Sequence, residues 1–167
     1  MSSLLAQPSF LKALYVGNAL WFTSAFYHFS FRQDLMMRKL SLRRSSRDAA
    51  VAALPSGDAW HHDIMAYLGG MNTALAALAV FRVYGLWRRV AGSAAAAPLS
   101  VRTADGDFSP DFMVLVVLGL GNCSQAVLNF TRSRASGRWI MGKGLDRITV
   151  LDAVFTVLDW AAALSGR

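Results

Sequence analysis

The sequence predicts an all-α integral membrane protein in which a single domain, residues 1–167, forms a bundle of four transmembrane helices. Two observations predict this fold. Hydrophobic residues make up 54% of the chain and charged residues only 16%, whereas about a quarter of the residues in a soluble globular domain are charged. The apolar residues also gather into four stretches, each close to the roughly 20 residues that a helix needs to cross a bilayer.

The four predicted helices span residues 10–31, 64–86, 111–130 and 148–164. The first is too long and too rich in bulky side chains for a cleavable signal peptide, so we expect it to be retained as an anchor. The second is rich in small residues, and the third contains two glycines among its aliphatic side chains. The fourth is the shortest and carries Asp152 and Asp159.

The basic residues predict the orientation of these helices. Of the 17 Lys and Arg residues, eleven fall in the first and third connections: Arg32, Arg38, Lys39, Arg43, Arg44, Arg47, Arg132, Arg134, Arg138, Lys143 and Arg147. The remaining six lie on the other side. Because cytoplasmic loops carry an excess of Lys and Arg, we predict that both connections are cytoplasmic and that both termini face the opposite side. Residues 34–42 are either a short amphipathic helix at the membrane surface or a solvated basic loop.

The charge and the metal-binding residue types exclude several functions. The net charge of +7 comes from residues that flank apolar stretches rather than from a folded basic face, so we expect no nucleic-acid partner. Cys123 is the only cysteine and lies in an apolar stretch, so it cannot form an internal disulfide or complete a zinc cluster. His61 and His62 point in different directions, and we expect Asp63 beside them to cap the second helix. We therefore expect no metal and no cofactor.

Polar side chains recur at helical spacing within the third and fourth predicted helices. They are Asn122, Gln125 and Asn129 in the third, and Thr149, Asp152, Thr156 and Asp159 in the fourth. Since polar groups are costly inside a bilayer, these two faces should meet each other or a shared cavity. One interpretation is interhelical hydrogen bonding that stabilises the bundle. The other is a polar binding cavity or proton path.

His28 extends the second interpretation, because it should lie at the same depth as Asp152. The two form either a structural hydrogen bond or a pair capable of acid–base chemistry. The candidate cavity residues are therefore His28, Asn122, Gln125, Asn129, Asp152 and Asp159. No catalytic signature accompanies them.

Two further patterns concern packing. Ala66, Gly70 and Ala74 are four residues apart, a spacing that lets helix backbones approach closely, either within the bundle or against a partner. A faint internal repeat places Gly17-Asn18 in the first helix and Gly121-Asn122 in the third. The repeat predicts two helix pairs of the same orientation.

The arrangement resembles the small four-span endoplasmic-reticulum scaffold proteins of ergosterol biosynthesis. The resemblance rests on Gly17-Asn18-Ala19-Leu20, on Phe81-Arg82-Val83-Tyr84-Gly85 at the end of the second helix, and on residues 122–130 with the basic residues that follow. In that family the third helix carries a His and a Glu, where this chain has Asn122 and Ala126. The resemblance implies a non-catalytic protein that tethers membrane enzymes, and it implies no catalytic residues.

The sequence therefore favours a non-enzymatic membrane scaffold or accessory subunit whose partners are other integral membrane proteins, among them enzymes of sterol or lipid metabolism. The first alternative is a small intramembrane enzyme or carrier for an apolar lipid, with a pocket between the polar faces of the third and fourth helices. The second is a supernumerary subunit of a respiratory or photosynthetic complex. We expect membrane lipids, sterol included, as further partners. The expected location is the endoplasmic reticulum or another intracellular membrane.

Overall fold

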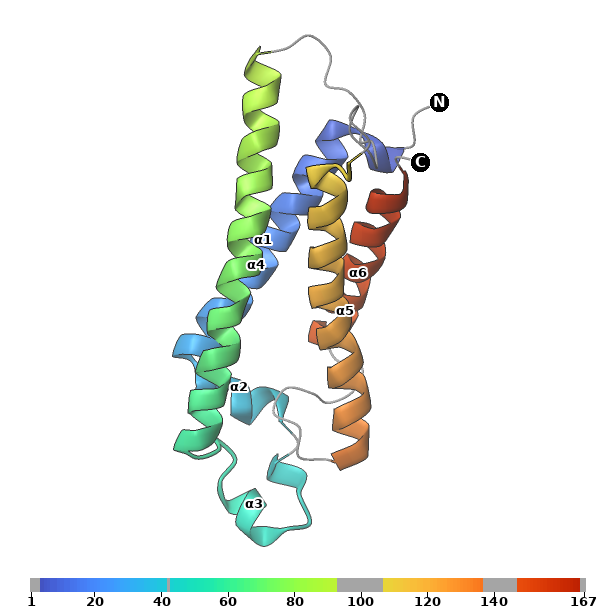
Figure 1. The fold of residues 1–167 in the computed structure, drawn as a ribbon. Coiled ribbons are helices and arrows are strands. Elements are labelled where there is room, and N and C mark those ends of the chain that lie inside the picture. Colours follow the sequence, from blue (N-terminus) through green and yellow to red (C-terminus); the bar gives the residue numbers. More distant parts are fainter. Residues whose placement is uncertain (1–3, 42, 93–106, 137–146, 166–167) are drawn as a thin grey trace.

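The structure, a computed structural model, describes residues 4–41, 43–92, 107–136 and 147–165, and within these ranges it contains helices and no strand (Figure 1). The four long helices are α1 (Pro8–Phe31), α4 (Ala59–Gly92), α5 (Pro110–Ser136) and α6 (Arg147–Ser165). The short elements are η1 (Leu4–Ala6), α2 (Gln33–Leu40), η2 (Arg43–Ser45) and α3 (Ala49–Ala53). The all-α prediction is confirmed for these residues, and each long helix extends the predicted stretch.

The long helices form two hairpin-like pairs. Helix α1 packs along α4, and α5 packs along α6. In Figure 1 the C-terminal ends of α1 and α5 and the N-terminal ends of α4 and α6 all lie at the end of the molecule that carries α2 and α3. The first described element, η1, and the C-terminal end of α6 lie toward the opposite end. The described helices therefore have the up–down arrangement that the sequence predicts, while most of the second and third connections lies outside the described residues.

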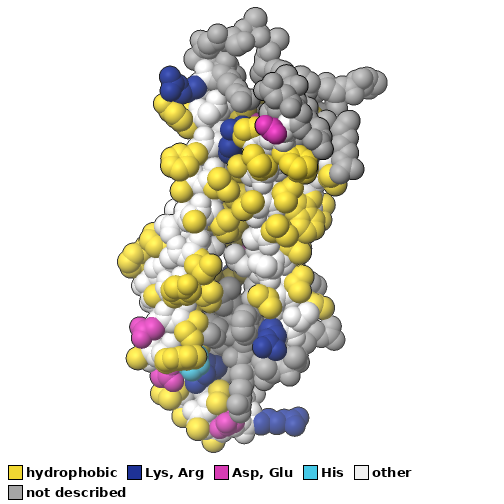
Figure 2. Space-filling view, in the orientation of Figure 1, with side chains coloured by type: hydrophobic (Ala, Val, Ile, Leu, Met, Phe, Trp, Pro, Cys, Tyr) yellow, Lys and Arg dark blue, Asp and Glu magenta, His cyan; other side chains and the backbone are white. Residues whose placement is uncertain are grey.

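The surface between these ends is apolar. Figure 2 shows hydrophobic side chains over the sides of the helices, with charged side chains mainly toward the two ends. Many large hydrophobic side chains are exposed, including Tyr67, Phe81 and Val157. Within the described residues, three helices are long and apolar enough to cross a membrane, over Ala59–Arg88, Pro110–Arg132 and Arg147–Ser165. An exposed apolar surface of this kind is typical of a membrane protein. That α1 also crosses the membrane stays a prediction.

The first connection contacts the long helices at a few buried residues, while most of its basic side chains are exposed. Its helix α2 corresponds to the amphipathic segment predicted near residues 34–42, and its Met37 is buried against Phe29 and Met65. Arg43 is also buried, and it donates from Nε to the carbonyl of Leu54 at 2.8 Å. This hydrogen bond joins two parts of the connection that are 11 residues apart in the sequence.

The predicted cap of the second long helix is wrong. Helix α4 begins at Ala59, earlier than expected, and Asp63 is an exposed residue inside it. The capping residue is Asp58, whose carboxylate accepts the backbone N–H of His61 at 3.1 Å and lies 2.7 Å from the ring Nδ1 of the same residue. These bonds lower the pKa of Asp58. The helix can start here because Gly57, with φ of 76°, ends the preceding turn.

Candidate functional site

A buried polar cluster joins the two helix pairs near the middle of the molecule. Asn18 of α1 donates from Nδ2 to Oδ1 of Asp159 on α6 at 2.8 Å. Asn122 of α5 donates to Asn18 Oδ1 at 3.0 Å and to Asp159 Oδ2 at 3.3 Å. All three side chains are fully buried. The carboxylate of Asp159 is thus held between two amide groups from two other helices.

A second layer lies closer to the end that carries α2. Trp21 of α1 donates from Nε1 to Oδ1 of Asp152 on α6 at 2.7 Å. Gln125 of α5 donates from Nε2 to Oδ1 of Asn72 on α4 at 3.4 Å. Each bond crosses from one helix pair to the other. Because both pairs exchange a hydrogen bond at this level, the layer connects all four long helices.

A third cluster lies toward the opposite end. Arg82 of α4 donates from Nη2 and Nε to Oδ1 of Asp111, at 2.6 and 3.0 Å. Tyr15 of α1 donates its hydroxyl proton to the same oxygen at 3.0 Å. The site residues predicted from the sequence include none of Tyr15, Arg82 and Asp111. The sequence signal for this cluster is Asp111 in the first turn of an apolar helix, because a carboxylate in such a helix is costly without a hydrogen-bond or ion-pair partner.

The two helix pairs make reciprocal contacts. The residues of the central Asn18–Asn122 bond are separated by 104 positions, and the same separation relates Gly17 to Gly121 and Trp21 to Gln125. This correspondence matches the repeat seen in the Gly-Asn pairs of the sequence. It indicates a pseudo-two-fold relation between α1–α4 and α5–α6.

Gly17 and Gly121 have equivalent contacts under this pseudo-two-fold relation. A Cβ added at Gly17 would lie 3.0 Å from the ring of Phe155 on α6. A Cβ added at Gly121 would lie 3.0 Å from the side chain of Leu75 on α4. Each glycine therefore makes room for a bulky side chain from the opposite pair.

The symmetry is broken by the two aspartates. Asp152 occupies the place in α6 that Asn72 occupies in α4, and Asp159 corresponds to Ala79. All four of these positions are buried. The second pair therefore carries carboxyl groups where the first carries an amide and a methyl group. Of these four positions, the two with carboxyl groups are both on α6.

The six candidate cavity residues do not share one cavity in the described part of the chain. Asn122, Asn129, Asp152 and Asp159 are packed between helices, with at most 1% of their surface exposed. His28 and Gln125 line a cavity of about 790 Å³. His28 makes no hydrogen bond to Asp152, whose Oδ1 accepts from Trp21, and its own Nδ1 has no partner among the described residues. The predicted His–Asp pair is therefore wrong, because the indole takes the place expected for the imidazole.

The small-residue stripe also differs from expectation. Gly70 is exposed, and a Cβ added there would meet nothing within 4 Å. The close approach of α4 to α1 occurs instead at Gly69, where an added Cβ would lie 2.9 Å from the backbone nitrogen of Ser30 and closer still to its Oγ. One residue is about 100° around a helix. Gly70 and Ala74 therefore do not supply the packing within this chain and remain candidates for contact with a partner, whereas Ala66 is half-buried and its carbonyl accepts from Ser30 Oγ of α1 at 3.5 Å.

The arrangement has a clear chemical consequence. The two α6 carboxyl groups are fully buried and accept hydrogen bonds from side chains of other helices, so they link helices within the molecule. No group of three or more His, Cys, Asp or Glu side chains that could hold a metal ion occurs among the described residues.

Comparisons of the chain with protein-family models, with curated proteins and with solved structures returned no match.

Proposed function

We propose that this chain is a non-catalytic scaffold or accessory subunit that crosses the membrane with four helices and binds other integral membrane proteins. Helix α1 is the span that needs an argument. It has 24 residues, roughly 36 Å at 1.5 Å per residue, and packs along α4. Polar residues that lower its mean hydropathy, Asn18 and Trp21, form hydrogen bonds to α6 inside the bundle. Its lipid-facing side is therefore more apolar than its sequence as a whole.

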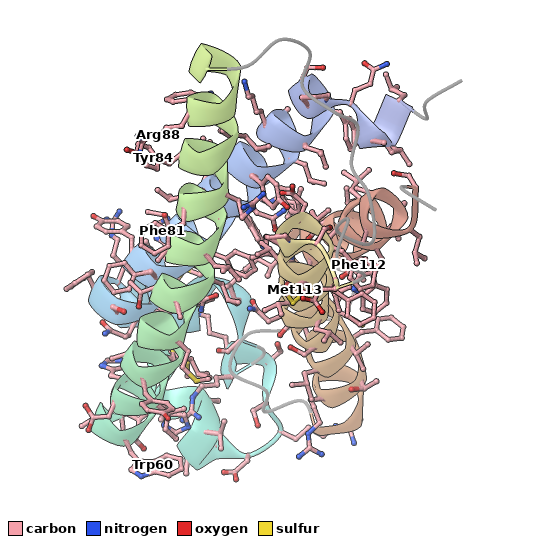
Figure 3. The ribbon with its side chains drawn as sticks, turned by 45° about the horizontal axis from the view of Figure 1, so that its top comes forward. Trp60, Phe81, Tyr84, Arg88, Phe112 and Met113 are labelled. Carbon is pink, nitrogen blue, oxygen red and sulfur yellow. The ribbon has the colours of Figure 1, made fainter. Side chains whose placement is uncertain are left out.

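The aromatic residues of α4 support the same membrane placement. Trp60 is exposed near one end of this helix and Tyr84 toward the other (Figure 3). Trp87, three residues after Tyr84, is also exposed. Trp60 and Tyr84 are about 36 Å apart along the helix axis, by its rise per residue. Tryptophan and tyrosine collect at the two membrane interfaces, which lie just outside a hydrocarbon core about 30 Å thick. The guanidinium carbon of Arg88 lies 5.7 Å from the centroid of the Tyr84 ring. Arg88 is closer to the C-terminal end of α4 than Tyr84 is.

The observation that carries the proposal is the outward position of the small residues on α4. Gly70 faces open space, Ala74 and Ala77 are exposed, and Ala66 is half-buried. Glycine and alanine gain little by facing lipid, whereas they allow a second helix to approach closely. Apart from the Ala66 carbonyl, which accepts from Ser30, this strip is not used by α1, which packs at Gly69, so its exposed residues are available to another membrane protein.

A second surface supports the proposal from the other side of the bundle. A groove of about 610 Å³ runs between α5 and α6 and is almost entirely apolar. Its walls include Val127 and Phe130 of α5 and Val154 and Val157 of α6. A groove of this shape suits the side chains of a transmembrane helix from a partner.

The strip predicts the effect of a bulky side chain. We expect Gly70→Leu to leave the fold intact, because the new side chain meets nothing in this chain, but to remove most of the partner that co-purifies in mild detergent. The matched control is Val117→Leu on α5, an exposed apolar position outside the strip. Partner recovery from Gly70→Leu cells equal to that of the control would rule out this interface.

The membrane topology is tested separately. In a Cys123→Ala background, we expect Arg44→Cys and Arg134→Cys to react with an impermeant maleimide from one side of the membrane, and a cysteine at Ser165 to react from the other. We expect this because the C-terminal ends of α1 and α5 and the N-terminal ends of α4 and α6 lie toward one end of the molecule. Labelling of Arg44→Cys and Arg134→Cys from opposite sides would contradict the four-span arrangement.

The co-purification experiment also separates the alternatives. Stoichiometric membrane proteins would support the scaffold, and the resemblance named above makes enzymes of sterol or lipid metabolism in the endoplasmic reticulum the first partners to look for. Recovery within a respiratory or photosynthetic complex would support the subunit alternative. A lone protein that processes or carries an apolar lipid would overturn the proposal.

A further inference from the structure

The cavity of about 790 Å³ lies at the end of the molecule that carries α2, between the C-terminal half of α1 and the first turns of α6. Its volume is in the range of pockets that hold a small organic ligand. Apolar side chains form much of its wall, among them Phe29, Met36 and Leu151. No acidic side chain lines it among the described residues.

Two basic side chains stand on the wall of this cavity. Lys39 comes from α2 and Arg147 is the first residue of α6, and both are exposed. Within the described residues neither has an ion-pair partner, whereas the neighbouring Arg38 pairs with Asp34 at 2.8 Å. Two cations from different elements therefore flank one cavity without an acid between them.

One buried polar atom on the cavity wall lacks a hydrogen-bond partner among the described residues. His28 lines the cavity, and its buried Nδ1 has no hydrogen-bond partner in the described part of the chain. Ser24 and Gln125 are further polar groups on the wall. A buried polar atom without a partner is costly, so a bound polar group would offset that cost.

The depth of the cavity matches an amphiphile. Its inner limit on α1 is Trp21, about two helical turns or roughly 10 Å from His28. Lys39 lies on the amphipathic helix α2, which follows α1 directly and belongs at the membrane surface. The cavity thus leads from a basic entrance at headgroup level into an interior whose wall is mostly apolar, with His28, Ser24 and Gln125 as polar groups.

We infer that this cavity binds one anionic phospholipid, with its phosphate between Lys39 and Arg147 and part of an acyl chain against Phe29 and Leu151. The basic entrance selects the negative headgroup, and the apolar wall accepts the chain. This site is distinct from the Gly70 strip, which lies on α4, so either can fail without the other.

Native mass spectrometry of the full-length protein tests the site. The protein is released from mixed micelles that contain equal amounts of phosphatidylglycerol and phosphatidylcholine. We expect one phosphatidylglycerol molecule to be retained in preference to phosphatidylcholine. The double variant Lys39→Gln/Arg147→Gln should weaken that binding about tenfold, since each basic residue near the surface contributes to anionic-lipid attraction.

Two controls make the result specific. The variant Arg38→Gln/Arg88→Gln removes the same charge from residues outside the cavity wall, and it should retain the lipid as the parent protein does. Ser24→Trp fills the cavity from an exposed position and should expel the lipid while circular dichroism stays unchanged. Equal loss in both charge variants, equal retention of phosphatidylcholine, or undiminished binding in a folded Ser24→Trp protein would each overturn the inference.

Discussion

Asp159→Leu should destabilise the protein by about 2–4 kcal/mol, whereas Asp159→Asn should cost no more than about 1 kcal/mol. Asp159 accepts hydrogen bonds from the amide nitrogens of Asn18 and Asn122. Leucine removes both acceptors and leaves two N–H groups without partners in a buried interface between the helix pairs. Asparagine keeps one acceptor oxygen for Asn18, and a flipped Asn122 amide can accept from the new amide at the loss of its own bond to Asn18 Oδ1, so this variant loses one hydrogen bond where leucine loses two.

The measurement is denaturant unfolding in detergent, with Val157→Leu as the control. Val157 is an exposed neighbour on α6, so its substitution should change the free energy of unfolding by less than about 0.5 kcal/mol. Equal stability of the Asp159→Leu protein and the control would show that this cluster does not hold the helix pairs together.

The asparagine variant also bears on function. If Asp159 has the structural role proposed here, a folded Asp159→Asn protein should keep its partners and its cellular activity. A carboxyl group that transfers protons cannot be replaced by an amide. A folded variant that retains its partners but loses all cellular function would therefore favour the lipid-enzyme alternative over the scaffold.

Gly69→Ala and Gly70→Ala should change stability in opposite directions, although the two glycines are adjacent. A methyl group at Gly69 would lie 2.9 Å from the backbone nitrogen of Ser30, so α1 and α4 must move apart, at a cost of about 1–3 kcal/mol. A methyl group at Gly70 meets nothing within 4 Å. Alanine there should stabilise the helix by about 0.5–1 kcal/mol, because glycine loses more backbone entropy on folding.

The pair is its own control, since both substitutions add one methyl group to the same helix. Thermal unfolding in detergent should place the melting temperature of Gly69→Ala below that of the parent protein and that of Gly70→Ala at or above it. The reverse order would mean that α4 is rotated relative to α1 from the position described here.

Local sequence patterns determined the helical class, the approximate helix limits and the buried face of α6. Thr149, Asp152, Thr156 and Asp159 are all buried, as their spacing predicts. This succeeds because the helical period places such residues on one face whatever the neighbouring helices are. The paired orientation of the helices followed from the same kind of information, together with the distribution of basic residues.

Only the tertiary structure decided which groups meet. Trp21 rather than His28 bonds Asp152, Gly69 rather than Gly70 admits α1, and Asp58 rather than Asp63 caps α4. Adjacent residues differ by about 100° around a helix, so a pattern such as Gly-Gly cannot show which one faces a neighbour. The Tyr15–Arg82–Asp111 cluster joins residues from three helices. Contacts of this kind depend on the rotation and depth of each helix in the bundle, which the packing of all four helices sets together.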